Sequence, residues 1–508
     1  MNSRVYVAAL TAIILGIPLA GFSASVTTHH NDNFRTGWNP QETTLTPSNV
    51  ATSFGQAAVV TLDAQVDAQP LVMSNQAVNG TIHSSVVFVA TENNSIYAID
   101  GTTGAILTAV RLETPVQASS LPQSCNNNSS IIGINSTPVI DPVSGTLYVV
   151  TATLGSGMIN HYLHALSTST LSDIVAPVQI TPPSSVIKWS RQRSALTLFN
   201  GGVLIPFTSF CDNDSLYTLG YLDYVTLAGT AQQAQALTSS LSLSSIWMSG
   251  GGPATSGNYI FFTTGNQTTS NNWGCYNPKY PKICNYPQSM IEMIGSSAPP
   301  PTLRIYSAVP PDTSIMYNDQ DFGAGSVLII PAGVPASITA STSPQFVAGA
   351  GKQGDLWVFT PALVGAKKYP IGGDCHCGTS YFSGADGNGH VVTSAGTTLG
   401  LYTVTASGLT PSLSAVLPSK AHGDPGVFTS ISSNGTAPGT AIIWTVSGPD
   451  SSSVLSLYAF DATTLTSLYT ASAGFWPYTG ANANTVPVVA NGHVYVASYG
   501  ELTIWTVH

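Results

Sequence analysis

The sequence predicts an all-β fold, an eight-bladed β-propeller, and two repeating patterns carry that prediction. A strand that reads like Ile-Tyr-Ala-Ile-Asp recurs at residues 95–100, 162–166, 355–359 and 456–461, each time within a run of short apolar strands separated by Gly, Asn and Asp turns. All-strand units that recur at roughly 40–60 residues are typical of propeller blades, since each small four-stranded sheet must stack on its neighbours to bury its faces.

The second pattern is a series of inner strands, which gives the number of blades. The eight candidates begin near Gln69, Thr137, Ser194, Gly252, Gly325, Tyr381, Val427 and Val486. The last unit has only three strands before the chain stops at His508, while the strand at residues 57–62 has no partner of its own. We therefore expect this N-terminal strand to complete the last blade, which removes the open sheet edges that promote aggregation. Residues 26–508 should form one propeller domain.

Composition narrows the class of partner. The chain of 508 residues is 43% hydrophobic and only 7% charged, with a net charge of −10 and no block of Lys or Arg. Such a surface argues against nucleic acid or an anionic membrane as partner. Ser, Thr, Asn and Gly must cover the surface instead, as in a Ser/Thr-rich secreted β-protein or a protein suited to an acidic medium.

The first residues predict export. A basic start with Arg4 and an apolar run over residues 5–19 indicate a signal peptide, which we place at residues 1–25. Phe22 stands where a lipoprotein needs Cys, so no lipid anchor is expected. No later apolar run is long enough to span a membrane. The expected location of the mature protein is secreted or periplasmic.

One repeat copy resembles a known family. Residues 98–104, Ala-Ile-Asp-Gly-Thr-Thr-Gly, are similar to the repeat of pyrroloquinoline-quinone (PQQ) propellers, the quinoprotein alcohol dehydrogenases. The likeness covers nearly the whole mature chain, although the other copies are eroded. It implies a quinoprotein-type propeller that binds PQQ and Ca²⁺ or a lanthanide, and that oxidises alcohols or sugar-like substrates.

The resemblance also implies candidate site residues. Trp247 is at the position of the family's Trp that stacks under the quinone, and Asn266, at the end of Phe-Phe-Thr-Thr-Gly-Asn, is at the position of its metal-ligating Asn. Asp321 in Asp-Gln-Asp-Phe-Gly is at the catalytic-base position, and Lys352 is at the position of the cation that contacts the quinone oxygens. These residue types suit the chemistry, because a flat quinone needs an aromatic surface to stack on and alcohol oxidation needs a base.

The sequence also departs from the family pattern. Only Cys125 stands where the enzymes have two adjacent Cys, the Trp before the base is missing, and Asp212 would have to replace a metal-ligating Glu. No Cys-x-x-Cys-His is present, so no haem is expected and an external electron acceptor would be required. These departures favour the alternative function, a non-catalytic propeller that binds a protein, a glycan or a cell-envelope component through its loop face.

Six cysteines in an exported chain favour disulfides over metal or redox sites. The preferred pairs are Cys275–Cys284 and Cys125–Cys211, although sequence alone leaves the connectivity open. Asp374-Cys375-His376-Cys377 is dense in metal-binding side chains, but zinc needs a fourth ligand and wider Cys spacing, so a structural loop is the preferred interpretation. His29 and His30 are expected in a mobile N-terminal arm.

Overall fold

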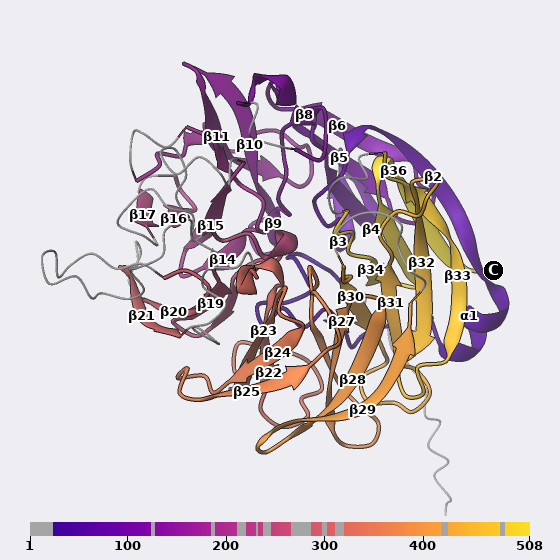
Figure 1. Ribbon diagram of the computed structural model, residues 1–508. Coiled ribbons are helices and arrows are strands. Elements are labelled where there is room, and N and C mark those ends of the chain that lie inside the picture. The colour runs from indigo at the N-terminus through magenta and orange to yellow at the C-terminus, as the bar shows by residue number, and fades with distance from the viewer. Residues whose placement is uncertain are drawn as a thin grey trace, which may run out of the picture.

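The computed structural model is a closed ring of eight four-stranded sheets (Figure 1). It describes residues 24–122, 127–183, 188–210, 220–229, 232–236, 245–265, 286–296, 302–309, 320–417, 425–477 and 483–508. Most of the expected signal peptide, residues 1–23, lies outside these ranges. In the described part of the chain, no helix is both long and apolar enough to cross a membrane.

Each blade is an antiparallel sheet whose first strand lies innermost. The first four blades are β3 (Leu71–Val78), β4 (Thr81–Ala90), β5 (Ser95–Asp100) and β6 (Ile106–Arg111); β9 (Val139–Asp141), β10 (Thr146–Gly155), β11 (Met158–Ser167) and β12 (Val178–Gln179); β14 (Thr197–Phe199), β15 (Gly202–Ser209), β16 (Tyr221–Thr226) and β17 (Gln232–Ala236); and β18 (Ala254–Ser256), β19 (Tyr259–Thr263), β20 (Met290–Gly295) and β21 (Leu303–Val309).

The other four blades repeat this order. They are β22 (Val327–Pro331), β23 (Pro344–Ala350), β24 (Asp355–Phe359) and β25 (Ala366–Pro370); β26 (Ser380–Ser383), β27 (Gly389–Ala395), β28 (Thr398–Thr405) and β29 (Gly408–Val416); β30 (Thr429–Ser432), β31 (Ile442–Val446), β32 (Val454–Asp461) and β33 (Ser467–Phe475); and β34 (Val488–Ala490), β35 (His493–Ala497), β36 (Tyr499–Val507) and β2 (Phe54–Gln65). The predicted inner strands are thus confirmed, as is the fold class.

The ring closes as the sequence predicts. The N-terminal strand β2 pairs antiparallel with β36, with Val60 opposite Leu502, and so forms the outer strand of the eighth blade (Figure 1). A short helix, α1 (Pro47–Ser53), leads into β2 and is capped by the side chain of Thr46, which accepts a hydrogen bond from the Asn49 N–H. Capping satisfies a backbone donor that would otherwise lack a partner at the helix start.

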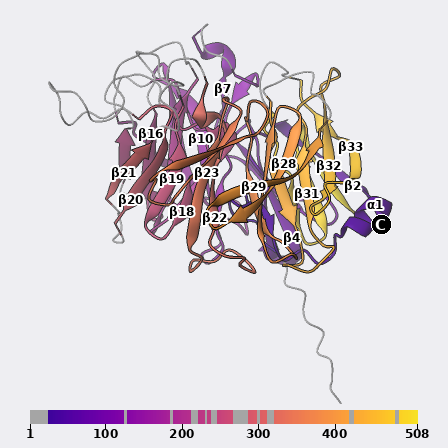
Figure 2. The same ribbon diagram turned by 60° about the horizontal axis from the view of Figure 1, so that its bottom comes forward.

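Smaller elements decorate the loops. They are β1 (Trp38–Asn39), which runs parallel to β30; β7 (Val116–Gln117) and β8 (Ile131–Ile132), which pair with each other; β13 (Ser190–Arg191), which pairs with β15; and the single 3₁₀ turns η1 (Ala118–Ser120), η2 (Met248–Gly250) and η4 (Phe322–Ala324). Seen from the side, β7 projects from one face of the ring, and α1 lies at its flank (Figure 2).

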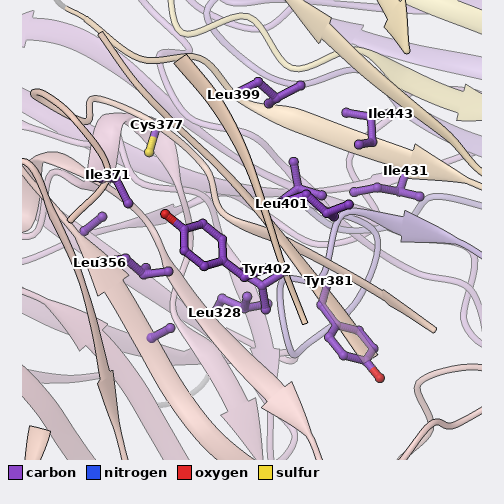
Figure 3. Close-up of a cluster of buried hydrophobic side chains, with 14 of the residues drawn as sticks. Leu328, Leu356, Ile371, Cys377, Tyr381, Leu399, Leu401, Tyr402, Ile431 and Ile443 are labelled. Carbon is purple, nitrogen blue, oxygen red and sulfur yellow. The ribbon is translucent and has the colours of Figure 1, made fainter. Parts of the chain in front are cut away.

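The hydrophobic cores lie between adjacent blades. Figure 3 shows one of them, in which Leu328 and Leu356 of the fifth blade meet Tyr381 and Leu401 of the sixth. Ile431 of the seventh blade belongs to the same cluster. Burial of large apolar side chains is the main favourable contribution to the free energy of folding. This explains why repeats of weak sequence similarity still form regular blades.

An unexpected feature is the segment of residues 26–39, which we call the strap. It passes the inner strand of every blade in turn and hydrogen-bonds to each. The contacts, in blade order, are Val26 with Val72, Thr27 with Ile140, Arg35 with Thr197, Asn33 with Thr255, Phe34 with Ile329, Thr36 with Tyr381, Gly37 with Ile431 and Asn39 with Val489. The chain therefore encircles the central channel once before it enters the eighth blade.

The strap corrects the expectation of a mobile arm around His29 and His30. Their exposed fractions are 2% and 0%, and the His30 ring makes hydrogen bonds of 2.7 Å to the carbonyls of Arg35 and Thr429. Arg35 is also buried and donates to the carbonyls of His29 and Pro253. The sequence prediction was wrong because the segment is polar, and its polar groups are buried against inner-strand backbone rather than exposed to water.

Candidate functional site

Three of the predicted site residues come together in one cavity. A cavity of about 230 Å³ at the mouth of the central channel is lined by Trp247, Asp321 and Lys352. Trp247 precedes the inner strand β18, Asp321 precedes the inner strand β22, and Lys352 follows the second strand β23. The remaining described wall consists of Arg191, Thr208, Ser209, Phe210, Ser245, Gly265, Gly323 and His376. Phe210 also packs in a cluster with Val116 of β7, so the cavity lies at the face from which β7 projects.

Trp247 is held by a strained turn. The three residues after it, Met248, Ser249 and Gly250, all have positive φ angles of 46°, 49° and 93°. Two non-glycine residues in this region cost about 1–3 kcal/mol each, so the surrounding contacts must compensate. The Ser194 hydroxyl donates to the Trp247 carbonyl at 2.8 Å, and Ser249 donates to the Ala324 carbonyl. The turn brings the indole to the cavity at the channel mouth.

Asp321 and Lys352 form an ion pair in the cavity. The Lys352 ammonium lies 2.8 Å from Asp321 Oδ2, and both side chains are about one-fifth exposed, at 22% and 20%. The backbones are joined as well, since the Lys352 N–H donates to the Asp321 carbonyl at 3.0 Å. A Cβ at Gly351 would lie 2.2 Å from that carbonyl, so only glycine allows this approach.

Arg191 adds a second cation to the cavity. Its guanidinium lies 5.0 Å from the centre of the Phe210 ring, and its Nε donates to Asn135 Oδ1 at 2.8 Å. Asn135 in turn donates to Asp67 and Glu92, which are almost fully buried. Burial, together with the adjacent Asp67, raises the pKa of Glu92 well above its usual value. Proton uptake by Glu92 removes one negative charge beside Arg191.

His376 also lines the cavity, although the sequence suggested only a structural loop around it. Its ring lies 5.6 Å from the Trp247 ring, nearly perpendicular at 82°. Cys375 and Cys377 on either side form a disulfide, with their Cα atoms 4.9 Å apart. The segment is therefore a structural loop closed by a bridge, as preferred from the sequence, and its histidine also lines the candidate cavity.

The predicted metal ligands cannot be placed. Asn266 and Asp212 lie outside the described residues, as do Cys125, Cys211, Cys275 and Cys284. Within the described ranges, no group of three His, Cys, Asp or Glu side chains is arranged to hold a metal ion. Ligation by Asn266 and Asp212 stays a prediction, and so do the pairings Cys275–Cys284 and Cys125–Cys211.

The sequence analysis missed Arg191 and His376 as site residues, although their position along the chain could have indicated them. Trp247 and Asp321 both lie a few residues before the inner strand of a blade, and Arg191 and His376 have the same place before β14 and β26. Loops that lead into inner strands converge at one end of the channel. Polar or aromatic side chains at that position in every blade are therefore site candidates, whatever the family pattern.

Several solved structures have a similar fold. The chain is similar to a quinohemoprotein alcohol dehydrogenase from Comamonas testosteroni, with a TM-score of 0.62 and 14% identity over 95% of this chain and 80% of that one. The fold is that of the quinoprotein alcohol dehydrogenases. The quinohemoprotein alcohol dehydrogenase ADHIIG from Pseudomonas putida HK5 has a TM-score of 0.63 and 10% identity, over 95% of this chain and 80% of that one.

A third solved structure matches this chain over nearly its own full length. A europium-containing methanol dehydrogenase is similar with a TM-score of 0.59 and 12% identity, over 95% of this chain and 98% of that one. No family model and no curated protein sequence matches the chain. TM-scores of 0.59–0.63 establish the fold, whereas identities of only 10–14% leave the activity to be argued from the site.

Proposed function

We propose that this quinoprotein-type propeller is an exported oxidoreductase that binds PQQ and a metal ion in the Trp247 cavity and oxidises alcohols or sugar-like substrates. One observation carries the proposal. Trp247, Asp321 and Lys352 were selected from the sequence by family position alone, and all three line the same cavity. Trp247 lies in the loop before the fourth blade, whereas Asp321 and Lys352 lie in two different loops of the fifth, so local sequence proximity does not account for their meeting.

The described residues suit the cofactor in ring chemistry and charge. PQQ is flat and acidic, and the cavity combines an indole with the cations of Arg191 and Lys352. Across the whole chain only 13 Lys and Arg residues oppose 23 acidic ones, so two cations in one small cavity are unusual for this protein. Charge-assisted contacts to carboxylates would orient the ligand over the ring.

Each residue would then have a distinct role. Trp247 would provide the stacking surface, and Lys352 and Arg191 would hold acidic or quinone oxygens. Asp321 stands at the base position, and Asn266 and Asp212 remain the proposed ligands for Ca²⁺ or a lanthanide. When bound, an ortho-quinone accepts a hydride from the carbinol carbon, with the cation polarising its carbonyl. Electrons would pass to an external acceptor.

The test combines binding with turnover. Purified mature protein is mixed with PQQ and either Ca²⁺ or a lanthanide, and the bound fraction is measured by absorbance after desalting. Trp247→Ala should abolish binding, whereas Trp357→Phe, on β24 and away from the cavity, should leave it unchanged. Dye-coupled oxidation of alcohols and sugars is measured on the same samples. Metal-dependent binding with turnover supports the enzyme, and binding without turnover supports the non-catalytic alternative. Absence of both from the wild type removes the proposal.

A further inference from the structure

We propose that Glu92 keeps a proton beside Asp67, and that this buried acid pair positions Arg191 for an acidic group of the ligand in the cavity. The inference rests on the proposed function, because it adds positioning residues to the same site. Asp67 precedes the inner strand β3, and Glu92 lies between β4 and β5. Neither is among the described residues that line the cavity, so both would act through the wall that carries Arg191.

One amide group holds the two carboxyl groups close together. The Asn135 Nδ2 donates to Asp67 Oδ2 at 2.7 Å and also to Glu92 Oε1. An oxygen of each acid therefore lies within hydrogen-bonding distance of the same nitrogen. Asp67 and Glu92 are 5% and 0% exposed, so water does little to screen their charges from each other. Two carboxyl groups this close and this deeply buried retain one proton between them.

The hydrogen-bond donors indicate which acid holds the proton. Asp67 accepts from three side-chain amides, those of Gln65, Asn128 and Asn135. Such donors stabilise a carboxylate. Burial raises the pKa of Glu92, and the contact with Asp67 raises it further. The Gly133 N–H, which donates to Glu92 Oε2 at 2.9 Å, and Arg191 act in the opposite direction without outweighing these effects. Asp67 is therefore the charged member of the pair, and Glu92 the neutral one.

Two asparagines connect the acid pair to Arg191. The amide nitrogens of Asn128 and Asn135 donate to Asp67 at 2.9 and 2.7 Å. Their amide oxygens accept from the Arg191 guanidinium at 3.4 and 2.8 Å. An amide carries its donor and its acceptor on opposite sides, so the acids orient both amides and the amides orient the guanidinium. The acid pair therefore positions Arg191 through these two side chains.

The proton on Glu92 also matters for the charge of the cavity wall. Whatever other groups contact Arg191, a neutral Glu92 places one negative charge fewer beside it than an ionised Glu92 would. A carboxylate of the ligand then meets a more positive wall. The other charged and titratable side chains around the pair are Arg193 before the third blade, Asp63 on β2, His29 in the strap, and Asp321, Lys352 and His376 in the cavity wall.

The first experiment uses the apoprotein and detects the proton directly. The carbonyl of a protonated carboxyl group absorbs in the infrared at a frequency distinct from that of a carboxylate. The difference spectrum between the wild type and Glu92→Gln at neutral pH should therefore contain a protonated-acid band. Glu113→Gln is the matched control and should lose no such band. Despite partial burial, interactions with His164 and Thr151 hold the pKa of Glu113 below its usual value. Absence of the band from the Glu92→Gln difference spectrum overturns the proposal.

The second experiment tests the positioning of Arg191 by measuring the affinity for PQQ at neutral pH with Ca²⁺ or a lanthanide present. Glu92→Gln keeps the shape and the neutral charge, so its affinity should stay within about 2-fold of the wild type. Glu92→Ala leaves the Asn135 amide and the Gly133 N–H without this acceptor, and binding should weaken by about 10-fold or more. Glu113→Gln should again match the wild type.

A double-mutant cycle separates this role from a general loss of stability. In an Arg191→Ala background, Glu92→Ala should weaken PQQ binding no further, because the group that it positions is already gone. An equal loss in both backgrounds, or a loss in Glu92→Gln as large as that in Glu92→Ala, overturns the inference. A wild type that does not bind PQQ rejects the proposed function, and with it the role assigned to Arg191, whereas the infrared band decides the protonation of Glu92 by itself.

Discussion

The guanidinium of Arg35 donates to the carbonyl of Pro253 at 2.9 Å and so joins the strap to the loop before the fourth blade. The same side chain donates to Thr28 and to the His29 carbonyl, both in the strap itself. Arg35 has a positive φ of 63° and an exposed fraction of 1%. A charged residue in this conformation and at this depth persists only where its surroundings compensate for it. Arg35 therefore links two parts of the strap to each other and to the loop before the fourth blade.

Removing this link should destabilise the whole propeller. Arg35→Ala leaves several buried carbonyl and hydroxyl groups without a donor, so we expect the free energy of unfolding to fall by about 3 kcal/mol or more. Deletion of residues 26–35 should prevent folding, since it removes contacts to most blades. Denaturant unfolding measures the first effect and soluble yield the second. Arg111→Ala, at an exposed residue of β6, is the control and should change stability by less than about 0.5 kcal/mol.

The outer strand of the eighth blade should be equally necessary, for a different reason. Deletion of residues 57–63 removes most of β2 and leaves β36 as an exposed edge with unpaired backbone groups. Exposed edges pair with other chains, so this variant should aggregate rather than merely lose stability. Light scattering during refolding distinguishes the two outcomes. A monomeric, stable variant would show that the strap alone closes the ring.

The sequence predicted the blades because their signal is local. Alternating apolar residues and turn glycines mark each strand, and the strand at residues 57–62 could be assigned to the last blade by counting. The strap could not be predicted in this way. Most of its residues are polar, they have no strand period, and its hydrogen bonds reach the inner strands of all eight blades. Burial of His30 between Arg35 and Thr429 depends on contacts nearly 400 residues apart, which no local pattern records.

The site was predictable only where this chain keeps the family's residue types. Trp247, Asp321 and Lys352 were found because they stand at positions that match the family's motifs and their order along the chain. His376 and Arg191 were missed as site residues, since their chemistry depends on which loops converge at the channel mouth. Convergence is set by the blade arrangement and not by spacing along the chain. The buried pair Asp67 and Glu92 was missed for the same reason.

The Cys375–Cys377 bridge should contribute modestly to stability. A loop this short restricts the unfolded chain little, so the double variant Cys375→Ser, Cys377→Ser should lose about 1–2 kcal/mol. Its larger effect should be local, because His376 would lose its fixed orientation against Trp247. Alkylation and mass spectrometry without reductant should find neither thiol free in the mature wild type. Free thiols at both positions would contradict the bridge.

Buried Asp223 should make stability depend on pH. Burial raises its pKa from 3.8 to about 7. The folded state therefore binds a proton that the unfolded state has lost, and stability from this group falls as the pH rises from about 4 to 7. Asp223→Asn should remove that slope and raise the free energy of unfolding at pH 8 by on the order of 2 kcal/mol. Unfolding measured across this range tests the effect.

Asp386 provides the contrast with opposite sign. Hydrogen bonds from Asn388 and His390 outweigh the effect of burial and lower its pKa to about 2. Its contribution to stability is present above about pH 4 and is lost as the pH falls toward 2. Half of its side chain is exposed, so water screens the interaction and the effect should be small. If Asp386→Asn and Asp223→Asn changed the pH dependence in the same direction, the assignment of these environments would be wrong.

Gly351 should be essential to the site because of a single close approach. A Cβ there would lie 2.2 Å from the Asp321 carbonyl and 2.6 Å from the Phe322 Cα, so Gly351→Ala must move one of the two loops. We expect a loss of about 1–3 kcal/mol in stability, displacement of Lys352 from Asp321 and loss of PQQ binding. Gly55→Ala is the control, since its Cβ would meet only the side chain of the terminal His508 at 3.1 Å, which can move aside. Thermal unfolding and PQQ titration of both variants measure the difference. Wild-type binding by Gly351→Ala would mean that the Asp321–Lys352 contact does not shape the pocket.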